Sequence, residues 1–205
     1  MKEIFLKYKM DFSDDIIRKF EIYKEFLKEW NKIINLTAII DDTDIVLKHF
    51  LDSSLIALNL FENQNNIKTV LDMGTGAGFP GLVSAILYPD INFTLVDSVN
   101  KKIVFIEDVV EKLALKNVFP KHHHLDKKNS SGKKFDLVMS RAFMKPDKLV
   151  YFTKKYIKNN GVSVMLLTEN QKEKYKNILE KFNPEISAYP FEGRNRYILK
   201  FKTKV

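Results

Sequence analysis

One stretch of the chain, residues 70–81, constrains the fold more than any other. It reads Val-Leu-Asp-Met-Gly-Thr-Gly-Ala-Gly-Phe-Pro-Gly, a short apolar run followed by glycine at alternate positions. Glycine adopts positive φ without strain and lets the backbone approach a ligand closely. A helix that begins after such a turn directs its free N–H groups toward that ligand. The stretch therefore predicts a buried strand, a ligand-binding turn and the start of a helix.

The chain after residue 69 alternates short strand and helix patterns. Apolar, β-rich runs predict strands at 69–73, 92–96, 135–139 and 162–167. Helical patterns fall between them, at 82–87, 101–115 and 148–157. This alternation is typical of βαβ units around a parallel sheet. Two last β-rich runs, 186–191 and 196–201, predict a closing antiparallel hairpin. The predicted fold class is α/β, a mostly parallel Rossmann-like sheet with a C-terminal antiparallel hairpin.

The first 68 residues have a helical pattern instead. Apolar residues recur at spacings of three and four over 13–34, with Ser13 as the expected N-cap. A second helix is predicted over 44–60, and the polar stretch 62–68 is typical of a linker. We therefore expect an N-terminal helical extension, residues 1–68, followed by a Rossmann-like domain, residues 69–205.

Composition excludes several classes of protein. The chain contains no cysteine, which rules out disulfides and cysteine-based zinc sites. The first ten residues carry three lysines and one glutamate and have no long apolar run, so they do not resemble a secretory signal. No run of about 20 apolar residues predicts a membrane span. We expect a soluble cytoplasmic protein.

The positive charge is concentrated after the first third of the chain. The formal net charge is +8. Residues 1–69 contain 10 Lys and Arg against 12 Asp and Glu, whereas residues 70–205 contain 24 against 14. A basic surface suits a phosphate-rich partner, although an excess of lysine can also be a compositional bias. The charge alone does not decide between these interpretations.

Two nucleoside cofactors compete for the glycine-rich turn. Residues 76–81 match G-x-G-x-x-G, the dinucleotide fingerprint, but Pro80 removes an N–H that a pyrophosphate would use. Counted from Asp72, the same stretch reads D-x-G-x-G-x-G, which is similar to the first motif of Rossmann-like methyltransferases. A carboxylate suits a cofactor with sulfonium and ammonium charges and would repel a pyrophosphate. Asp97, at the end of the next predicted strand, is placed to accept hydrogen bonds from ribose hydroxyls. A tight turn without a ligand is the third alternative.

Several stretches resemble one family, the glucose-inhibited division protein B family, also called RsmG. Its members are 16S rRNA methyltransferases that make 7-methylguanosine. The resemblance implies the class I methyltransferase form of the sheet, S-adenosyl-L-methionine as the cofactor, and 16S rRNA or the small ribosomal subunit as the partner of a monomer. The matching stretches are Trp30-Asn31-Lys32, Asn35-Leu36-Thr37, Lys48-His49-Phe50-Leu51-Asp52-Ser53, residues 72–81, Leu95-Val96-Asp97-Ser98, Lys101-Lys102, Phe135-Asp136, Ser140-Arg141-Ala142-Phe143 and Arg196-Tyr197-Ile198-Leu199.

The turn and the resemblance together indicate the residues of the cofactor site. Gly74 and Phe79 lie in the turn, and Leu125 and Asp126 match the family's segment near the adenine. The full predicted set of cofactor contacts is Asp72, Gly74, Gly76, Gly78, Phe79, Asp97, Leu125, Asp126 and Arg141.

Methylation at N7 of guanine requires no catalytic base, because N7 has a lone pair and no proton. The enzyme mainly aligns the two reactants, which contributes about 7–11 kcal/mol. An oxygen atom near the base would stabilise the positive charge that moves onto it. Asn35, His49 and Asp52 are the candidates for this pocket, although a lone histidine is often only structural.

Four basic residues are candidate RNA contacts: Lys101, Lys102, Arg141 and Arg196. Arg141 follows a strand and is expected to bind a phosphate or guanine O6, or to form an ion pair with Asp72 or Asp97. The run 122–124 is three consecutive histidines, which cannot all face one ion, so no metal site is predicted. A methyltransferase for a metabolite or protein, and a non-catalytic RNA-binding protein, remain alternatives.

Overall fold

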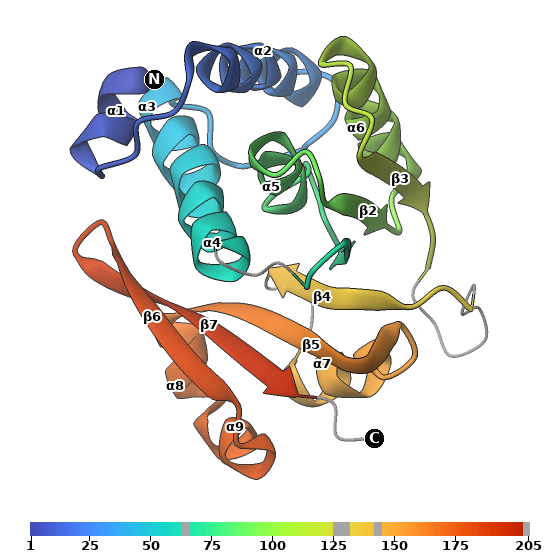
Figure 1. Ribbon diagram of the computed structural model, residues 1–205. Helices are drawn as coiled ribbons and strands as arrows, with labels where there is room; N and C mark the ends of the chain where they lie inside the picture. The colour runs from blue at the N-terminus through green and yellow to red at the C-terminus, as the bar shows by residue number, and fades with distance from the viewer. Residues whose placement is uncertain (63–65, 125–131, 142–144, 203–205) are drawn as a thin grey trace.

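The computed structural model describes residues 1–62, 66–124, 132–141 and 145–202, which form a seven-stranded sheet with helices on both faces (Figure 1). Across the sheet the order is β3-β2-β1-β4-β5-β7-β6. The strands β3, β2, β1, β4 and β5 run parallel, and β7 is antiparallel to both β5 and β6. The strands are β1 (Thr69–Met73), β2 (Asn92–Asp97), β3 (Val118–His122), β4 (Phe135–Arg141), β5 (Ile157–Thr168), β6 (Glu185–Phe191) and β7 (Arg194–Lys202).

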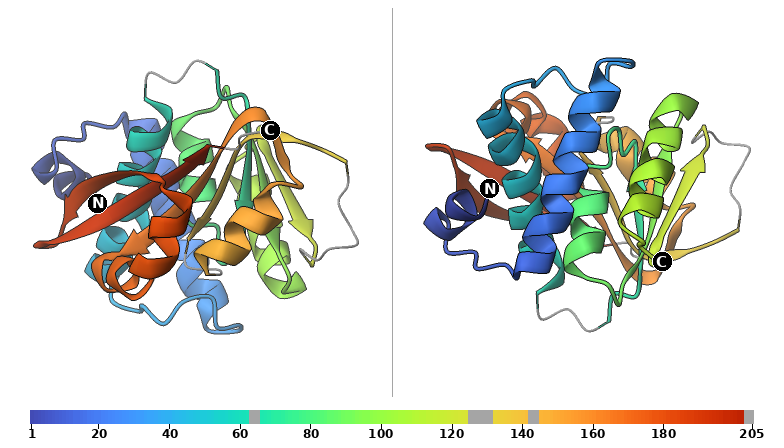
Figure 2. Two further views of the ribbon diagram at one scale, coloured as in Figure 1. Left: turned by 90° about the horizontal axis from the view of Figure 1, so that it is seen from below. Right: turned by 90° about the horizontal axis from the view of Figure 1, so that it is seen from above.

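The helices lie in layers on either side of this sheet. Helices α4, α5 and α6 lie side by side on one face, with α2 packed outside α5 and α6, and α7, α8 and α9 lie on the other face (Figures 1 and 2). Among the described helices, none combines the length and apolarity needed to cross a bilayer. The helices are α1 (Lys2–Lys7), α2 (Asp14–Asn31), α3 (Asp42–Ile45), the π-helical segment η1 (Val46–Leu51), α4 (Asp52–Phe61), α5 (Gly81–Leu87), α6 (Asn100–Lys112), α7 (Pro146–Thr153), α8 (Glu169–Lys174) and α9 (Lys176–Phe182).

Strand β1 shows why the central strands are apolar on both faces. Side chains alternate along a strand, so Val70 packs in the core beneath α5, while Leu71 and Met73 pack in the core beneath α7. A parallel sheet covered by helices buries both faces of its strands. Asp72 interrupts this pattern on the α5 face, where it is buried at the end of the strand. A charged residue in this position needs polar partners.

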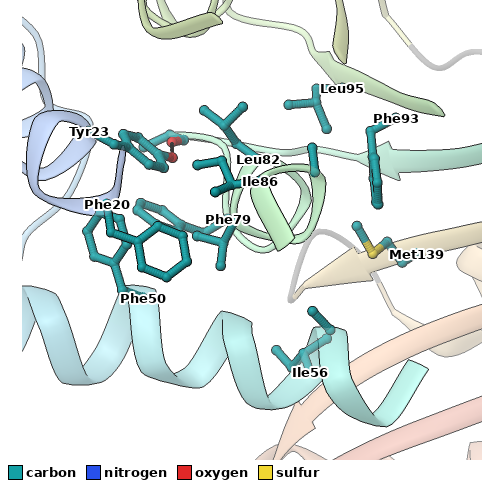
Figure 3. Close-up of a cluster of buried hydrophobic side chains, with 14 of the residues drawn as sticks. Phe20, Tyr23, Phe50, Ile56, Phe79, Leu82, Ile86, Phe93, Leu95 and Met139 are labelled. Carbon is teal, nitrogen blue, oxygen red and sulfur yellow. Dashed lines mark hydrogen bonds between the residues drawn. The ribbon is translucent and has the colours of Figure 1, made fainter. Parts of the chain in front are cut away.

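The N-terminal helices share a core with the sheet. Helix α2 begins after Ser13, whose Oγ accepts a hydrogen bond from the Ile16 N–H at 3.4 Å. Phe20 and Tyr23 of this helix point toward Phe50 and Phe79, next to the α5 side chains (Figure 3). One continuous cluster of buried side chains therefore joins residues 5–61 to the α5 face of the sheet. The division of the chain at residue 68 stays a prediction.

The predicted elements differ from the structure in three places. The helix predicted over 148–157 ends at Thr153, and Ile157 instead begins β5, paired with Phe135. The helix predicted over 44–60 runs from 42 to 61 and contains the π-helical segment η1. The sequence reading did not predict β3, α1, α8 or α9, which are short and weakly periodic. The other predicted strands and the closing hairpin are confirmed.

Replacing Phe20 with alanine tests the shared core. Phe20 is fully buried and contacts the rings of Phe5, Phe12 and Phe50. We expect Phe20→Ala to lower the free energy of unfolding by about 3–5 kcal/mol, because it leaves a cavity. Urea denaturation followed by circular dichroism should show one shifted transition. Ile33→Ala, at a side chain that is 77% exposed, should change stability by less than about 0.5 kcal/mol. Two separate transitions would show that residues 1–68 unfold as their own unit.

Candidate functional site

The glycine loop between β1 and α5 is held against the next strand by backbone hydrogen bonds. The N–H groups of Gly74 and Thr75 both donate to the Val96 carbonyl, at 2.8 and 3.0 Å. Gly74, Gly76 and Gly78 all have positive φ, at 71°, 62° and 92°. A Cβ atom on Gly76 would meet nothing within 4 Å, so the loop is open on that side. The loop therefore has the conformation and the free space that a close ligand requires.

Asp72 fixes the two ends of this loop. Its Oδ2 accepts hydrogen bonds from Thr75 Oγ1 at 2.8 Å and from the Gly81 N–H at 3.0 Å. A Cβ on Gly81 would lie 2.5 Å from Oδ2, so only glycine allows this approach. The other oxygen, Oδ1, is buried and has no hydrogen-bond partner among the described residues. A cationic group of a ligand near the loop would suit this carboxylate.

Asp97 ties the middle of the loop to the end of β2. Its Oδ2 accepts a hydrogen bond from the Gly76 N–H at 3.0 Å, and its Oδ1 accepts one from the Val99 N–H at 2.9 Å. Each carboxylate oxygen has a second lone pair, and the residue keeps 7% of its surface exposed. It can therefore accept further bonds from a ligand's hydroxyl groups.

A stack of rings connects the loop to the N-terminal helices. The Phe79 ring stacks with Tyr23, with centroids 5.1 Å apart, and with His49, with centroids 4.6 Å apart. The Tyr23 hydroxyl donates a hydrogen bond to the Ala77 carbonyl. The Arg141 guanidinium lies over the Phe79 ring, 5.8 Å from its centroid. Phe79 thus holds α2 and η1 against the glycine loop.

A cavity of about 310 Å³ lies beside this stack, with His49 and Arg141 in its wall. Asp52 is buried in the same wall and is close to three polar side chains. The Tyr189 hydroxyl donates to its Oδ1 at 2.8 Å. Arg196 Nε is 3.6 Å from Oδ1, and an Arg141 nitrogen is 3.8 Å from Oδ2. The cavity therefore combines one carboxylate with two arginines.

The sheet topology explains why these side chains meet. The carboxyl ends of parallel strands lie along one edge of a sheet, and β4 ends there at Arg141. The antiparallel strand β7 begins at this edge, with Arg196 opposite Thr168 at the end of β5. Tyr189 of β6 is in turn opposite Arg196. The closing hairpin thus adds two side chains to the edge that carries the glycine loop.

His49 is held by the loop that follows α2. Its Nε2 and Thr37 Oγ1 are 2.8 Å apart. Asn31 Oδ1 accepts hydrogen bonds from the N–H groups of Leu36 and Thr37, and Asn31 Nδ2 donates to the Thr37 carbonyl. Asn31 therefore shapes the loop that orients the His49 ring. Asn35 is exposed and does not line the cavity.

Burial shifts the pKa values of three site residues. It raises the pKa of Asp72 to about 6, although the bonds from Thr75 and Gly81 oppose the shift. It lowers the pKa of His49 to about 4, and the positive charge of Arg141 acts in the same direction. It also raises the pKa of Asp52, against the opposing charge of Arg141 and the Tyr189 hydrogen bond. At neutral pH His49 is uncharged and Asp72 is mostly ionised.

Comparison with known proteins identifies the family. The model of the GidB family, described as rRNA small subunit methyltransferase G, matches residues 16–188. The chain belongs to this family. Ribosomal RNA small subunit methyltransferase G of Clostridium perfringens (strain SM101 / Type A) is 43% identical over 182 residues, which cover 87% of this chain and 72% of the relative. The Lachnoclostridium phytofermentans protein of the same name is 42% identical over 156 residues, which cover 74% of this chain and 63% of the relative.

Solved structures show the same fold. A SAM dependent methyltransferase from Aquifex aeolicus has a TM-score of 0.60 and 18% identity, covering 80% of this chain and 94% of that chain. A putative caffeoyl-CoA O-methyltransferase from Staphylococcus aureus has a TM-score of 0.60 and 16% identity, covering 88% and 92%. At these identities the likeness concerns the fold alone. The predicted family and the class I methyltransferase fold are confirmed.

The structure groups the predicted site residues of this family member into two parts. The first is the loop with its carboxylates: Asp72, Gly74, Gly76, Gly78, Phe79 and Asp97. The second is the cavity wall: His49, Asp52, Arg141 and Arg196. Arg141 is paired with Asp52, and not with Asp72 or Asp97 as the ion-pair alternative proposed. Leu125 and Asp126 lie outside the described residues.

The two candidate RNA contacts Lys101 and Lys102 lie in the first turn of α6, after Asp97. Lys101 is exposed and Lys102 is half-buried, and neither forms an ion pair with a described residue. They line neither the cavity nor the glycine loop. Within the described chain, no three His, Asp or Glu side chains come together as a metal-binding group.

Sequence reasoning missed Tyr189 and Asn31 as contributors to the site. The hairpin offered a signal for Tyr189. Its turn lies at Glu192 and Gly193, both with positive φ, which suits a two-residue hairpin loop. Counting outward from that turn places Tyr189 opposite Arg196. Asn31 sits in the last turn of α2, and no spacing in the sequence distinguishes it from Asn35.

Asp72 and His49 affect stability in opposite directions over one pH range. The pKa of Asp72 is higher in the folded state, so its contribution to stability is full below pH 3.8 and is lost as pH rises through about 6. The pKa of His49 is lower in the folded state, so stability is lost as pH falls from 6.5 to about 4. The two contributions offset each other in the native chain.

Two variants separate these contributions. As pH falls from 6 to 4, the unfolding free energy of Asp72→Asn should decrease relative to that of the native chain, by at most about 3 kcal/mol. The variant lacks the stability that the native chain gains when Asp72 takes up a proton. His49→Gln should gain unfolding free energy over the same range. Urea denaturation at pH 4, 5, 6 and 7 measures both. Parallel pH profiles for a variant and the native chain would contradict the assigned burial of that side chain.

Proposed function

We propose that this chain transfers a methyl group from S-adenosyl-L-methionine to N7 of a guanine in 16S ribosomal RNA. Its family, the rRNA small subunit methyltransferases G, supports the reaction class and the type of RNA. One observation carries the proposal for this chain: Phe79 of the glycine loop contacts His49 and Arg141, which line the polar cavity. A cofactor at the loop and a base in the cavity would therefore be neighbours.

The loop residues fit a cofactor with both positive charge and hydroxyl groups. Within the described part of the chain, the Asp97 carboxylate accepts hydrogen bonds from backbone N–H groups, which leaves lone pairs for ribose hydroxyls. Asp72 has a buried oxygen without a hydrogen-bond partner among the described residues and adds negative charge beneath the loop. Gly76 leaves open space for close approach. The bound cofactor supplies a methyl group on a positively charged sulfur.

The residues of the cavity need only hold the base and exclude water. N7 of guanine has no proton to remove, so the reaction needs no general base, and His49 is oriented by Thr37 and buried in the ring stack. Alignment of the two reactants is the main source of rate acceleration. The Asp52 carboxylate adds negative charge to the cavity in which the base becomes positive. Asn35 is too exposed to serve in this pocket.

The basic residues supply the contacts to RNA phosphates. Lys101 and Lys102 stand free of ion pairs with described carboxylates, in the first turn of α6 after Asp97. Arg196 lies at the cavity beside Asp52. Phosphate contacts release counterions, so binding should weaken as salt rises. A methyltransferase that acts on a metabolite would not show this salt dependence.

Mapping modified guanosines tests the proposed reaction. Small-subunit rRNA from cells lacking this protein should contain one 7-methylguanosine fewer than rRNA from complemented cells. Chemical cleavage at N7-methylated positions, followed by primer extension, locates the difference. Purified protein with S-adenosyl-L-methionine should restore the modification on isolated subunits or rRNA. Identical modification patterns in the two strains would overturn the proposal.

Calorimetry tests the cofactor site separately. We expect Asp97→Asn to weaken binding of S-adenosyl-L-methionine by on the order of 10- to 100-fold, because hydrogen bonds to a charged acceptor are lost. The control is Asp147→Asn, an exposed acidic residue of α7 on the other face of the sheet. Unchanged affinity in Asp97→Asn would remove Asp97 from the site.

A further inference from the structure

We infer that Asp52 recognises the N1–H and the 2-amino group of the target guanine and thereby makes the cavity selective for this base. The inference rests on the proposed function, since it concerns the base that the cavity would hold. It adds a specificity determinant that neither the family membership nor the cofactor site requires.

Asp52 is the one carboxylate among the described residues that line the cavity. It is the first residue of α4, directly after the π-helical segment that carries His49. The other polar groups of the wall are donors, are already engaged, or are uncharged acceptors such as His49 Nδ1, which has no hydrogen-bond partner among the described residues. Arg141 and Arg196 have only N–H groups, and the Gln171 side-chain oxygen accepts bonds from Thr168. Asp52 is therefore the strongest acceptor available to a base.

Both oxygens of Asp52 have room for new hydrogen bonds. Oδ1 accepts the Tyr189 hydroxyl and lies near Arg196. Oδ2 has Arg141 as its partner at 3.8 Å, which is longer than a hydrogen bond. A carboxylate offers about four lone-pair positions, so most of them stay free. A ligand with two adjacent N–H groups can use both oxygens without displacing Tyr189.

The position of the loop fixes which edge of the guanine meets Asp52. The N7 atom must face the glycine loop, which follows β1 near the middle of the sheet. Tyr189 and Arg196, which hold Asp52 Oδ1, lie on β6 and β7 at one side of the sheet. In guanine, N1 and the 2-amino group lie on the six-membered ring, away from N7. A guanine with N7 toward the loop therefore presents these donors to Asp52.

This arrangement discriminates against adenine. Guanine offers an N1–H and a 2-amino group, which are both donors, whereas adenine has an unprotonated N1 and no 2-amino group. The lone pair of adenine N1 would face a carboxylate that has no proton to donate, so the free lone pairs of Asp52 would gain no partner from the base. Sites built to hydrogen-bond a substrate group reject analogues that lack it. The arginines meanwhile balance the buried charge of Asp52, and Arg141 can donate to guanine O6.

Replacing the target guanosine with inosine tests the contact directly, because inosine lacks only the 2-amino group and keeps N7. The substrate is small-subunit rRNA that carries a single inosine at the mapped position, prepared by ligation and compared with the same ligated RNA carrying guanosine. With the native enzyme, kcat/KM should fall on the order of 10- to 100-fold for inosine. Equal kcat/KM for the two RNAs would overturn the inference.

Two variants assign the discrimination to Asp52. Asp52→Asn should reduce the guanosine-to-inosine ratio toward one, since an amide presents an N–H to the 2-amino group. Tyr189→Phe keeps the carboxylate and should keep the ratio, whatever its effect on the rate. A folded Asp52→Asn protein with the full native ratio would contradict the assignment. If Asp52→Asn does not fold, equal kcat/KM of the native enzyme for the two RNAs still overturns the inference.

The outcomes also separate this inference from the proposed function. Native enzyme that methylates no guanosine in small-subunit rRNA would end the proposed function. Native enzyme that methylates guanosine at N7 but treats inosine equally would leave that function intact and remove only the role of Asp52.

Discussion

The binding of the glycine loop by two strand-end carboxylates is the interaction on which the site depends. Asp72 holds the start and end of the loop through Thr75 and Gly81, and Asp97 holds its middle through Gly76. Three residues with positive φ give the loop its path, but they do not by themselves choose one conformation. The carboxylates choose it, because they accept N–H groups that the turn leaves without backbone partners. The burial of a charge beneath the loop is the energetic consequence, visible in the raised pKa of Asp72.

The N-terminal helices complete this loop rather than merely covering it. Tyr23 of α2 bonds to the Ala77 carbonyl and stacks with Phe79, and His49 of η1 stacks with the same ring. The space for these rings exists because Gly78 has no side chain: a Cβ there would lie 2.6 Å from the Tyr23 hydroxyl. The loop therefore connects two parts of the chain with different secondary structure. A substitution in the N-terminal helices should therefore alter the conformation of the glycine loop through Phe79.

The cavity is built in a different way, from segments far apart in the sequence. Asp52 and Tyr189 are separated by 137 residues and meet because the antiparallel strand β7 returns to the carboxyl edge of the parallel strands. The two arginines and the tyrosine hydroxyl stabilise a buried carboxylate that would otherwise be costly. The π-helical segment before Asp52 places His49 and Asp52 in the wall of the same cavity. The glycine loop and the cavity are thus neighbours, because Phe79 of the loop contacts His49 and Arg141 of the cavity wall.

The sequence by itself determined the local elements of this protein: the strand, turn and helix around the glycine loop, the parallel sheet, and the closing hairpin. These follow from periodicity and from glycine, whose effects act over a few neighbouring residues. It also indicated Asp72 and Asp97, because a strand end fixes where they lie. Only the tertiary structure decided that Arg141 pairs with Asp52, that Tyr189 completes the cavity, that Asn35 lies outside it, and that the predicted extension shares the core. Those outcomes depend on strand order and on packing between distant segments, and a hydrophobic pattern carries no information about which distant polar groups will meet.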